Sequence, residues 1–537
     1  MNETEIILGL LLVVAAVAWV ANRLRIPYPI LLVIGGLALS FIPRLPSVNL
    51  KPDHVFLLFL PPILYYAGLQ TSWRDFRANI RPIALLAVGL VLFTTLAVAI
   101  AAHVIIGMSW ATSFVLGAII SPPDAIAATA ILQRLRVPRR VVTILEGESL
   151  VNDATALVIY RFAILAVVSG KFSLPWASVQ FVLVSVGGVI IGLLAGMIIA
   201  WIRPRLRDSS VEHVVSLLTP YAAYLPAEWL HVSGVLAVVT CGIYIARRLG
   251  RITTAEIRLR AWAVWDTVIF LLNGLVFILI GLQMSNIVKQ VPAGTLSQVI
   301  GWPVIISIVA ILARFAWVPT VAYLPPVLFP VLRRLDPVPP PPANVFIVAW
   351  TQMRGVVSLA AALALPMTLA DGITPFPYRN LIVFLTFGVI LITLVGQGLT
   401  LPVIIRALRL DRVSNEHADE ENTARYLAAL AAIERLDTLG ANDAAAAAAL
   451  QRARAEYDER IAYYSRTINP DRDGPGAGAG GMLMTCNSSE DVMRQAIQAQ
   501  RDMLGRLRDQ GVIGDDVLRH LEHELDHEEA RMLDAAH

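Results

Sequence analysis

Long apolar runs separated by short polar loops fill the chain from its beginning to about residue 410. A helix of about 20 apolar residues crosses the roughly 30 Å hydrocarbon core of a bilayer, so runs of this kind predict membrane spans. We count thirteen of them, at roughly 5–21, 28–43, 55–71, 81–106, 110–133, 141–169, 178–202, 212–226, 230–248, 257–284, 300–323, 343–368 and 378–408. The pattern predicts an all-α polytopic membrane protein with about thirteen transmembrane helices. The eighth and ninth runs are the least regular, because Pro220 and Pro226 interrupt them.

The basic residues of the loops are distributed unevenly, and this predicts the direction in which the chain crosses the membrane. Loops after odd-numbered runs hold nineteen arginines, whereas loops after even-numbered runs hold five basic residues. Cytoplasmic loops carry the excess of Lys and Arg in membrane proteins. We therefore expect the N-terminus outside and the C-terminal tail in the cytoplasm.

Composition agrees with the apolar pattern and adds a domain boundary. The 537 residues are 57% hydrophobic and only 15% charged. Residues 1–410 hold 29 basic and 15 acidic side chains, whereas residues 411–537 hold 14 basic and 25 acidic ones, so the net charge changes from +14 to −11. The sequence therefore predicts a membrane domain over 1–410 and an acidic, helical cytoplasmic domain over 411–537. Two cysteines, Cys241 and Cys486, exclude a disulfide framework or a cysteine-based metal site.

The tail is predicted to form helices near 416–439, 441–467, 488–510 and 513–535, with a flexible, glycine-rich linker at about 469–489. Its last helix contains His523-Glu-Leu-Asp-His527, which matches the H-E-x-x-H pattern of zinc proteases. A zinc protease site needs a third ligand and a substrate cleft. Only ten residues follow the motif, in a charged and solvated helix. We interpret it as a chance match.

The sixth run carries acidic side chains where a membrane span is expected to be apolar. Residues 146–155 read E-G-E-S-L-V-N-D-A-T. On a helix, Asp153 shares a face with Ser149, while Asn152 lies about 100° round and stacks over Glu148. An ionised side chain at the centre of a span costs about 2.5–3.5 kcal/mol, and such residues mark ion or proton pathways. The alternative is a set of polar groups that only hold helices together.

Two further runs are predicted to be interrupted helices. The fifth contains Ser121-Pro-Pro-Asp124, in which two prolines remove backbone donors and block the helix. The twelfth contains Thr351-Gln-Met-Arg-Gly355, in which the glycine permits a break. Freed carbonyls at membrane depth are tolerated where they line a cavity or an ion site. The two breaks lie seven runs apart, a spacing typical of a transporter built from inverted repeats.

Charged residues within the runs need partners. A buried arginine needs an acidic partner, and we expect Arg354 to form an ion pair with Glu148; helix-end carbonyls are the alternative. Arg314 and Asp266 are interpreted as supporting packing or lying near the membrane boundary. Arg161 is interpreted as a structural pair or a snorkelling side chain. Four side chains are expected to line the cavity: Tyr66, Ser121, Pro123 and Thr155.

Together these segments resemble a known family of transporters. Residues 147–153 (G-E-S-L-V-N-D), 122–124 (P-P-D) with Ala125 after them, 60–62 (L-P-P) and 354–355 (R-G) are similar to segments of the bacterial sodium/proton antiporters of the monovalent cation:proton antiporter superfamily. The likeness is greatest to the NhaP-like branch, whose sixth span carries an Asn-Asp pair. It covers the predicted membrane domain and not the tail.

The resemblance implies a homodimer in the bacterial cytoplasmic membrane, with thirteen spans in each protomer. It implies a core domain in which the fifth and twelfth spans cross as broken helices and which moves like an elevator. It also implies that Asp153 and Asp124 hold the monovalent metal cation, that Ser149 contributes a hydroxyl and that Asn152 shapes the site. The expected arginine–glutamate pair would then hold the core together.

The resulting functional prediction is secondary exchange of a monovalent cation for a proton. A buried carboxylate at Asp153 binds either a proton or a cation, and this competition couples the two fluxes. Asn152, in place of a second acid, predicts electroneutral one-for-one exchange. Na⁺ is the expected cation, with K⁺ and Li⁺ as alternatives, because Pro123 and Tyr66 stand where relatives often carry a threonine and an acid.

Other function classes fit the residues less well. An intramembrane hydrolase using Ser149 would need a base such as histidine nearby, and the sixth run has none. A cation channel would need a continuous pore and would show flux without proton coupling, while a transporter of organic anions is disfavoured by the excess of carboxylates. We therefore predict no enzyme activity, no cofactor and no nucleic-acid partner. The expected partners are Na⁺ (or K⁺ or Li⁺), H⁺, membrane lipid and a second copy of the chain.

Overall fold

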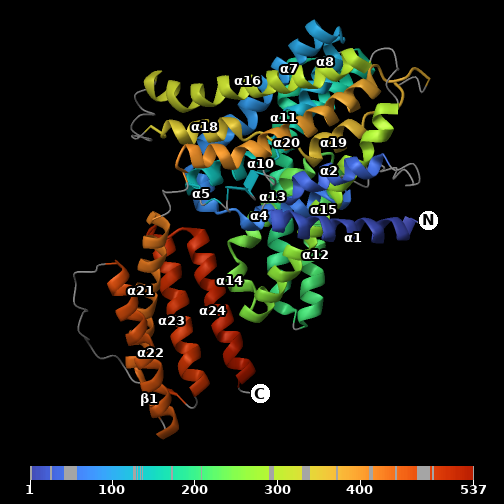
Figure 1. Cartoon of the computed structure of the whole chain (residues 1–537). Helices are drawn as coiled ribbons and strands as arrows, with labels where there is room; N and C mark the ends of the chain where they lie inside the picture. Colours follow the sequence, from blue (N-terminus) through green and yellow to red (C-terminus); the bar gives the residue numbers. More distant parts are fainter. Residues whose placement is uncertain are drawn as a thin grey trace. The chain divides into compact units, whose positions relative to one another are not determined.

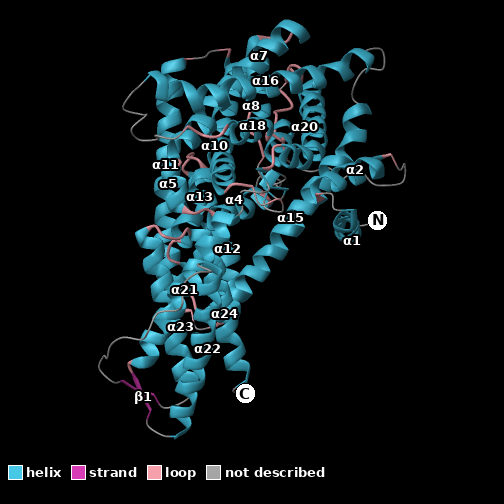
Figure 2. Cartoon of the chain, turned by 60° about the vertical axis from the view of Figure 1, so that its left-hand side comes forward, coloured by secondary structure: helices cyan, strands magenta, loops and turns pink. Residues whose placement is uncertain are grey.

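Helices make up nearly all of the structure, a computed structural model (Figure 2). It divides into two compact units, one of residues 1–252 and 264–411 and the other of residues 253–263 and 412–537. The structure describes residues 3–535 apart from 25–26, 42–56, 125–127, 130, 133–134, 136, 171–172, 207, 290–295, 329–338, 370–372, 411–414, 442–443, 469–483 and 487–488. Ala125 and most of the predicted linker at 469–489 lie outside these residues.

The first unit consists of helices that follow one another closely along the chain (Figure 1). They are α1 (Glu3–Leu24), α2 (Tyr28–Ser40), α4 (Leu60–Gln70), α5 (Trp73–Ala78), α6 (Ile80–Ala84), η1 (Leu85–Leu90), α7 (Val91–Ala101), η2 (Ala102–Ile106), α8 (Trp110–Ile120), α10 (Arg139–Ser169), α11 (Leu174–Ile202), η3 (Arg203–Arg205), α12 (Ser209–Trp229), α13 (Gly234–Ala246), α14 (Leu249–Ile252), α15 (Ala255–Lys289), α16 (Leu296–Leu328), α18 (Pro342–Trp350), α19 (Val356–Leu363) and α20 (Arg379–Ala407). The first residues of α15 belong to the second unit.

Six of the described helices are long and apolar enough to cross a membrane. They cover Ile80–Ile106, Arg139–Ser169, Pro175–Arg205, Ile257–Gln283, Gly301–Leu324 and Arg379–Ala407, and shorter apolar helices lie among them. In the most apolar stretch of α20, 67% of the residues are buried, whereas in that of α11 only 22% are buried. Helix α20 is therefore central, whereas α11 turns large apolar side chains such as Leu183 and Trp201 outward, as expected next to lipid. This unit agrees with the prediction of an α-helical, polytopic membrane protein.

Packing separates most of the membrane helices into two sets. Helices α7, α8, α10, α16, α18, α19 and α20 pack mainly on one another and are called the core helices below. Helices α4, α11, α12 and α13 also pack mainly on one another and are called the scaffold helices. Helix α10 touches both sets, because it also contacts α4, α11 and α13.

Glycines allow several helix pairs to approach closely. A Cβ atom added at Gly192 on α11 would lie 2.2 Å from the carbonyl oxygen of Ala237 on α13. A Cβ atom at Gly36 on α2 would lie 2.3 Å from the carbonyl oxygen of Ile278 on α15. Small residues at crossings are what membrane helices use to gain van der Waals contact where lipid removes the hydrophobic driving force.

The helix from Ile80 to Ile106 widens into π-helical turns at η1 and η2. At the first of these turns the carbonyl oxygen of Leu85 accepts a 3.1 Å hydrogen bond from the indole Nε1 of Trp317 on α16. The same indole packs on Gly89, where a Cβ atom would lie only 2.5 Å from the ring. The side chain of one core helix therefore fixes an irregular turn in another.

The second unit is a bundle of α21 (Asn415–Asp437), α22 (Ala444–Ile468), α23 (Ser489–Gln510) and α24 (Asp515–Ala535) (Figure 1). Its helices lie close to the predicted ranges. The sequence did not predict the short parallel pairing of β1 (Leu439–Ala441) with β2 (Met484–Cys486), because three-residue strands are too short for an alternating pattern to emerge.

A buried ionic network ties the start of α15 into the second unit. The carboxylate of Asp526 on α24 is buried and accepts hydrogen bonds from Arg258 on α15 and, at 2.7 Å, from Arg501 on α23. On the exposed side of the same helix, the Nε2 atoms of His523 and His527 lie 3.2 Å apart. Both ends of the H-E-x-x-H motif thus lie on the bundle surface and not in the membrane unit.

The close α11–α13 crossing generates a stability prediction. Gly192→Ala is expected to lower stability by about 1–3 kcal/mol, since the added methyl group meets backbone that cannot move aside without shifting a helix. Gly301→Ala is the matched control, because nothing lies within 4 Å of its added Cβ atom. The measurement is the thermal unfolding midpoint in detergent. Equal midpoints for the two variants would contradict the tight crossing.

Candidate functional site

The candidate residues of the sixth run lie on α10, the long helix between Pro138 and Gly170. Proline before the first turn suits a helix start, and Gly170 ends the helix with a φ of 67°. Glu148, Asn152 and Asp153 are all buried on this helix. The predicted helical stretch with buried polar groups is therefore present, and its neighbours decide what those groups can do.

Helix α8 ends where its two prolines begin. The helix stops at Ile120, and Pro122, Pro123 and Asp124 follow in non-helical conformation. The hydroxyl of Ser121 donates a 3.1 Å hydrogen bond to the carbonyl oxygen of Ala118 within its own helix. The predicted interruption of the fifth run is thus confirmed, and the Ser121 hydroxyl serves the helix end.

The twelfth run is interrupted as predicted. Residues 351–355 are non-helical between α18 and α19. Glycine is required at position 355 for a steric reason, since a Cβ atom there would lie 1.6 Å from Oδ2 of Asp124. Its φ of −142° is open to other residues. The close approach of the Asp124 carboxylate, and not backbone strain, explains this glycine.

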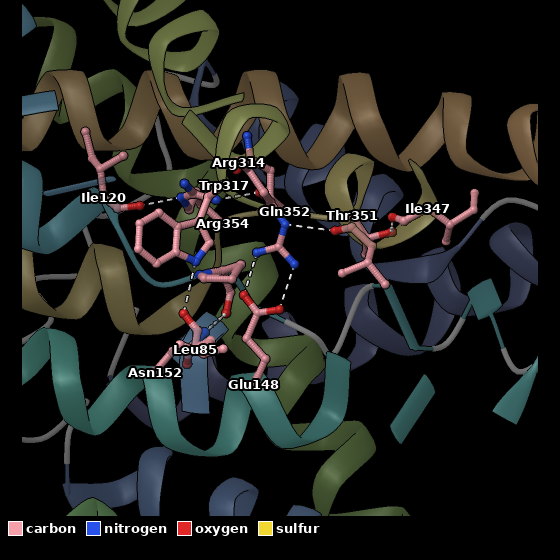
Figure 3. Close-up of polar contacts among 12 residues, drawn as sticks. Leu85, Ile120, Glu148, Asn152, Arg314, Trp317, Ile347, Thr351, Gln352 and Arg354 are labelled. Carbon is pink, nitrogen blue, oxygen red and sulfur yellow. Dashed lines mark hydrogen bonds and ion pairs between the residues drawn. The ribbon is translucent and has the colours of Figure 1, made fainter. Parts of the chain in front are cut away.

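The two breaks contact each other directly. The backbone N–H of Asp124 donates a 2.7 Å hydrogen bond to the carbonyl oxygen of Met353. In the opposite direction, Nε of Arg354 donates to the carbonyl oxygen of Ile120 at the end of α8 (Figure 3). Each break thus supplies a partner for a backbone group that the other has left without its helical hydrogen bond.

Asn152 connects α10 to these breaks. Its Nδ2 atom donates a 3.0 Å hydrogen bond to the carbonyl oxygen of Pro123. Its Oδ1 atom is buried and accepts no hydrogen bond from the described residues. Asp153 follows directly on α10 and is buried as well. The structure thus brings together three of the four predicted cation-binding residues, while Ser149 lies half-buried one turn before Asp153 on α10.

The predicted ion pair between Glu148 and Arg354 is wrong. Glu148 instead forms a two-pronged ion pair with Arg314 of α16, with Nη1–Oε1 and Nη2–Oε2 distances of 2.5 and 2.7 Å (Figure 3). Both side chains are only 1% exposed. Arg314 also donates from Nε to the carbonyl oxygen of Val348 at 2.8 Å.

Arg354 follows the alternative that was left open, pairing with helix-end carbonyls. Besides Ile120, it donates from Nη1 to the carbonyl oxygen of Gln352 at 2.6 Å. Its backbone N–H donates to Oγ1 of Thr393 on α20 at 3.2 Å. The guanidinium group faces the carbonyl end of α8, where the helix dipole favours a positive charge. The sequence did contain a signal for the Glu148–Arg314 contact. Arg314 is the one arginine of the eleventh run, and a charge within a span requires a partner.

The remaining candidates for lining the cavity have other contacts. The hydroxyl of Thr155 is buried and donates to the carbonyl oxygen of Val151 on its own helix at 3.1 Å. The hydroxyl of Tyr66 on α4 donates to the carboxylate of Asp266 on α15 and accepts from Gln70 at 2.8 Å. Tyr66 thus links two helices, and Asp266 supplies a carboxylate beside the tyrosine.

The charges at the breaks do not cancel. Among the described residues of these contacts, Asp124, Glu148 and Asp153 are acidic, whereas Arg314 and Arg354 are basic. Three carboxylates against two guanidinium groups leave one net negative charge when all are ionised. A buried net charge is costly, and one proton or one monovalent cation would offset it. Oxygen ligands from carboxylate and amide groups suit a hard cation of this kind.

Comparisons with known proteins agree on one family. A family model described as sodium/hydrogen exchanger, transmembrane, matches residues 9–407. The chain is 36% identical to an uncharacterised Na⁺/H⁺ exchanger of Mycobacterium tuberculosis, over all of this chain and 98% of that protein. It is 35% identical to the sodium, potassium, lithium and rubidium/H⁺ antiporter of Bacillus subtilis, over 73% of this chain and 60% of that protein.

A solved structure supports the fold. The sodium/proton antiporter MjNhaP1 of Methanocaldococcus jannaschii matches with a TM-score of 0.59 and 19% sequence identity, over 76% of this chain and 99% of that one. At this level of identity the likeness concerns the fold alone.

The Glu148–Arg314 contact generates a double-mutant prediction. Glu148→Gln and Arg314→Met are each expected to lower stability by about 3–5 kcal/mol, because each leaves a buried charge without its partner. The double variant should recover part of the loss but not all, since Val348 loses a donor as well. The measurement is the unfolding free energy or midpoint in detergent, compared with the cycle of Glu148→Gln and Arg354→Met. A larger coupling energy for Arg354 than for Arg314 would contradict the observed pairing.

Proposed function

The chain belongs to the sodium/hydrogen exchanger family, and from this membership we propose that it exchanges a monovalent cation for a proton at Asp153. The observation that supports the proposal most is the position of this carboxylate. It is buried beside the contact of two broken helices, next to an asparagine whose side-chain oxygen has no described donor. Exchange is the family's activity, and these residues supply a reason for its coupling.

The coupling follows from competition for one site. Asp153 with a bound proton and Asp153 with a bound cation carry the same net charge, so either form offsets the excess negative charge of the breaks. The empty, ionised form is disfavoured in a buried position. In this proposal Oδ1 of Asn152 is a ligand of the cation, which is supported by its lack of a described donor and by the hydrogen bond that holds its amide nitrogen to Pro123. Asp124 and Ser149 are the further ligands in this proposal.

The charge balance leads to one-for-one exchange. Glu148 is neutralised by Arg314 in a two-pronged pair, and Arg354 carries the second positive charge at the breaks. The backbone of Asp124 is tied to Met353, and its carboxylate packs on Gly355. Asp153 then remains as the group that alternates between proton and cation, and the cycle moves no net charge.

The larger architecture is also part of the proposal. We infer thirteen spans that form inverted repeats, with the N-terminus outside, the tail in the cytoplasm and two protomers in a dimer. The mutual hydrogen bonds of the two breaks support a crossing of the fifth and twelfth spans. An elevator-like motion would carry the core helices past the scaffold helices.

Na⁺ is the cation proposed first, with K⁺ and Li⁺ as alternatives. The family model and the mycobacterial relative are both described by sodium. The Bacillus subtilis relative is named for sodium, potassium, lithium and rubidium, which favours keeping the wider set. Reconstituted protein with a trapped pH dye, given Na⁺, Li⁺, K⁺ and choline chlorides in turn, would identify the cation.

Removing the proposed carrier group should abolish exchange. Asp153→Asn keeps the size of the side chain but can neither release a proton nor offer a charge to a cation. Thr155→Val is the matched control on the same buried stretch of α10, since its hydroxyl already bonds within the helix. Cation-driven pH change in proteoliposomes is the measurement. Near-normal exchange by Asp153→Asn would remove this residue from the centre of the mechanism.

Exchange is also expected to be insensitive to membrane potential. One monovalent cation against one proton moves no net charge, so a voltage worth about 2.3 kcal/mol per elementary charge at 100 mV has nothing to act on. The rate and end point are measured with and without an imposed potential. A K⁺/valinomycin potential serves for Na⁺ or Li⁺, and another voltage source is needed if K⁺ is transported. An end point that follows the voltage would overturn the one-for-one scheme.

A further inference from the structure

A cavity lies directly beside the candidate site. Its volume is about 320 Å³, and residues of α10 from Ala154 to Arg161 line one side of it. Scaffold residues line the other side, among them Tyr224 and Glu228 of α12 and Val235 of α13. Ala154 follows Asp153 in the sequence, so the cavity reaches the residue next to the one proposed to carry the ion.

An ion pair forms part of the lining of this cavity. Nη2 of Arg161 lies 3.2 and 3.1 Å from the two carboxylate oxygens of Glu228. The arginine stands two turns after Asp153 on α10, and the glutamate stands in the last turn of α12. The pair therefore joins a core helix to a scaffold helix at the cavity.

The two ends of the ion pair are fixed to different sets of helices. Helix α10 is held to the core by Asn152, by Glu148 and by the hydroxyl of Tyr160, which donates to the carbonyl oxygen of Ala361 on α19 at 2.7 Å. Helix α12 packs on α4, α11 and α13. If the core helices move past the scaffold helices, as the proposed function requires, Arg161 and Glu228 must separate.

The strength of the pair suits reversible opening. The side chains of Arg161 and Glu228 are 49% and 33% exposed, and ion pairs with such exposure contribute only about 0.2–1 kcal/mol. The Glu148–Arg314 pair, at 1% exposure on both sides, would cost about 3–5 kcal/mol to break. The first can open in every cycle, whereas the second must move as one piece with the core.

We propose that Arg161 and Glu228 form a latch that stabilises the state in which the cavity lies open beside Asp153, and that releases as α10 moves along α12. They are positioning residues for transport, acting through the helices they join. The inference rests on the proposed exchange function for its purpose, but the latch is testable without measuring exchange.

The test measures access to the cavity. Leu157→Cys places a thiol in the lining, in a chain whose native cysteines are replaced by Cys241→Ala and Cys486→Ala. The full-length protein in proteoliposomes receives a short pulse of a membrane-impermeant thiol reagent, added separately from each side. The ratio of labelled to protected protein then reports the population of the state that exposes the cavity.

Loss of the latch should lower this ratio. Arg161→Gln and Glu228→Gln are each expected to reduce it roughly 1.5- to fivefold, the factor that corresponds to an exposed ion pair. The exchanged pair, Arg161→Glu with Glu228→Arg, should restore the ratio to within about twofold of the parent, since attraction across the cavity is regained.

An ion pair at the other end of α10 serves as the control. Arg139 and Asp75 also form an ion pair, with 20% and 23% exposed side chains, but the helix that carries Asp75, α5, packs mainly on α6 and α10. Arg139→Gln and Asp75→Asn should leave the labelling ratio unchanged. Unchanged labelling in both Arg161→Gln and Glu228→Gln, or an exchanged pair no better than the single variants, would overturn the latch.

Exchange assays on the same vesicles separate the two proposals. If the single variants change the labelling ratio and the exchanged pair restores it, the latch is supported. If in the same vesicles no cation drives a pH change, the proposed function fails and the latch does not. If cations drive a pH change but the labelling ratio is the same with and without the Arg161 and Glu228 substitutions, the function is supported and the latch is rejected.

Discussion

The structure of the candidate site depends on backbone groups that two interrupted helices leave without helical partners. Helix α8 stops before Pro122 and Pro123, and the break between α18 and α19 leaves further carbonyls free. No water competes for such groups within a hydrocarbon layer, so protein must supply their partners. The breaks largely supply one another, through Asp124 to Met353 and Arg354 to Ile120. This requirement brings two distant segments together and places their polar side chains in one spot.

The charges of the site follow from the same requirement. Guanidinium groups are suited to carbonyl-rich helix ends, because each offers five donors and keeps its positive charge. Arg354 serves the end of α8, while Arg314 serves Val348 and neutralises Glu148. Because both arginines make these structural contacts, the excess negative charge lies on the acidic side chains at the breaks. In the proposed function, the same arginines that stabilise the broken helices thus define how much charge a bound cation or proton would offset.

The sequence predicted the helices and both breaks but assigned one ion pair wrongly. Prolines, glycine and apolar runs act locally along the chain, so α8, α18 and α19 end close to where the pattern indicates. The partner of Glu148 depends instead on the rotation of α16 against α10, which no local pattern records. Arg354 was expected to need an acid, whereas free carbonyls satisfy it. The cation-binding role of Asn152 and Asp153 stays a prediction.

Ion pairs of different burial give the membrane unit both rigid and separable contacts. Glu148–Arg314 lies within the core helices and is shielded from water, so its separation would expose two charges to a low dielectric. Arg161–Glu228 lies at a cavity where water can solvate each partner as they part. A transporter that moves one set of helices past another requires strong contacts inside each set and weaker ones between them. In the proposed mechanism, the exposure of each ion pair therefore indicates whether the pair holds one set of helices together or joins two sets that separate.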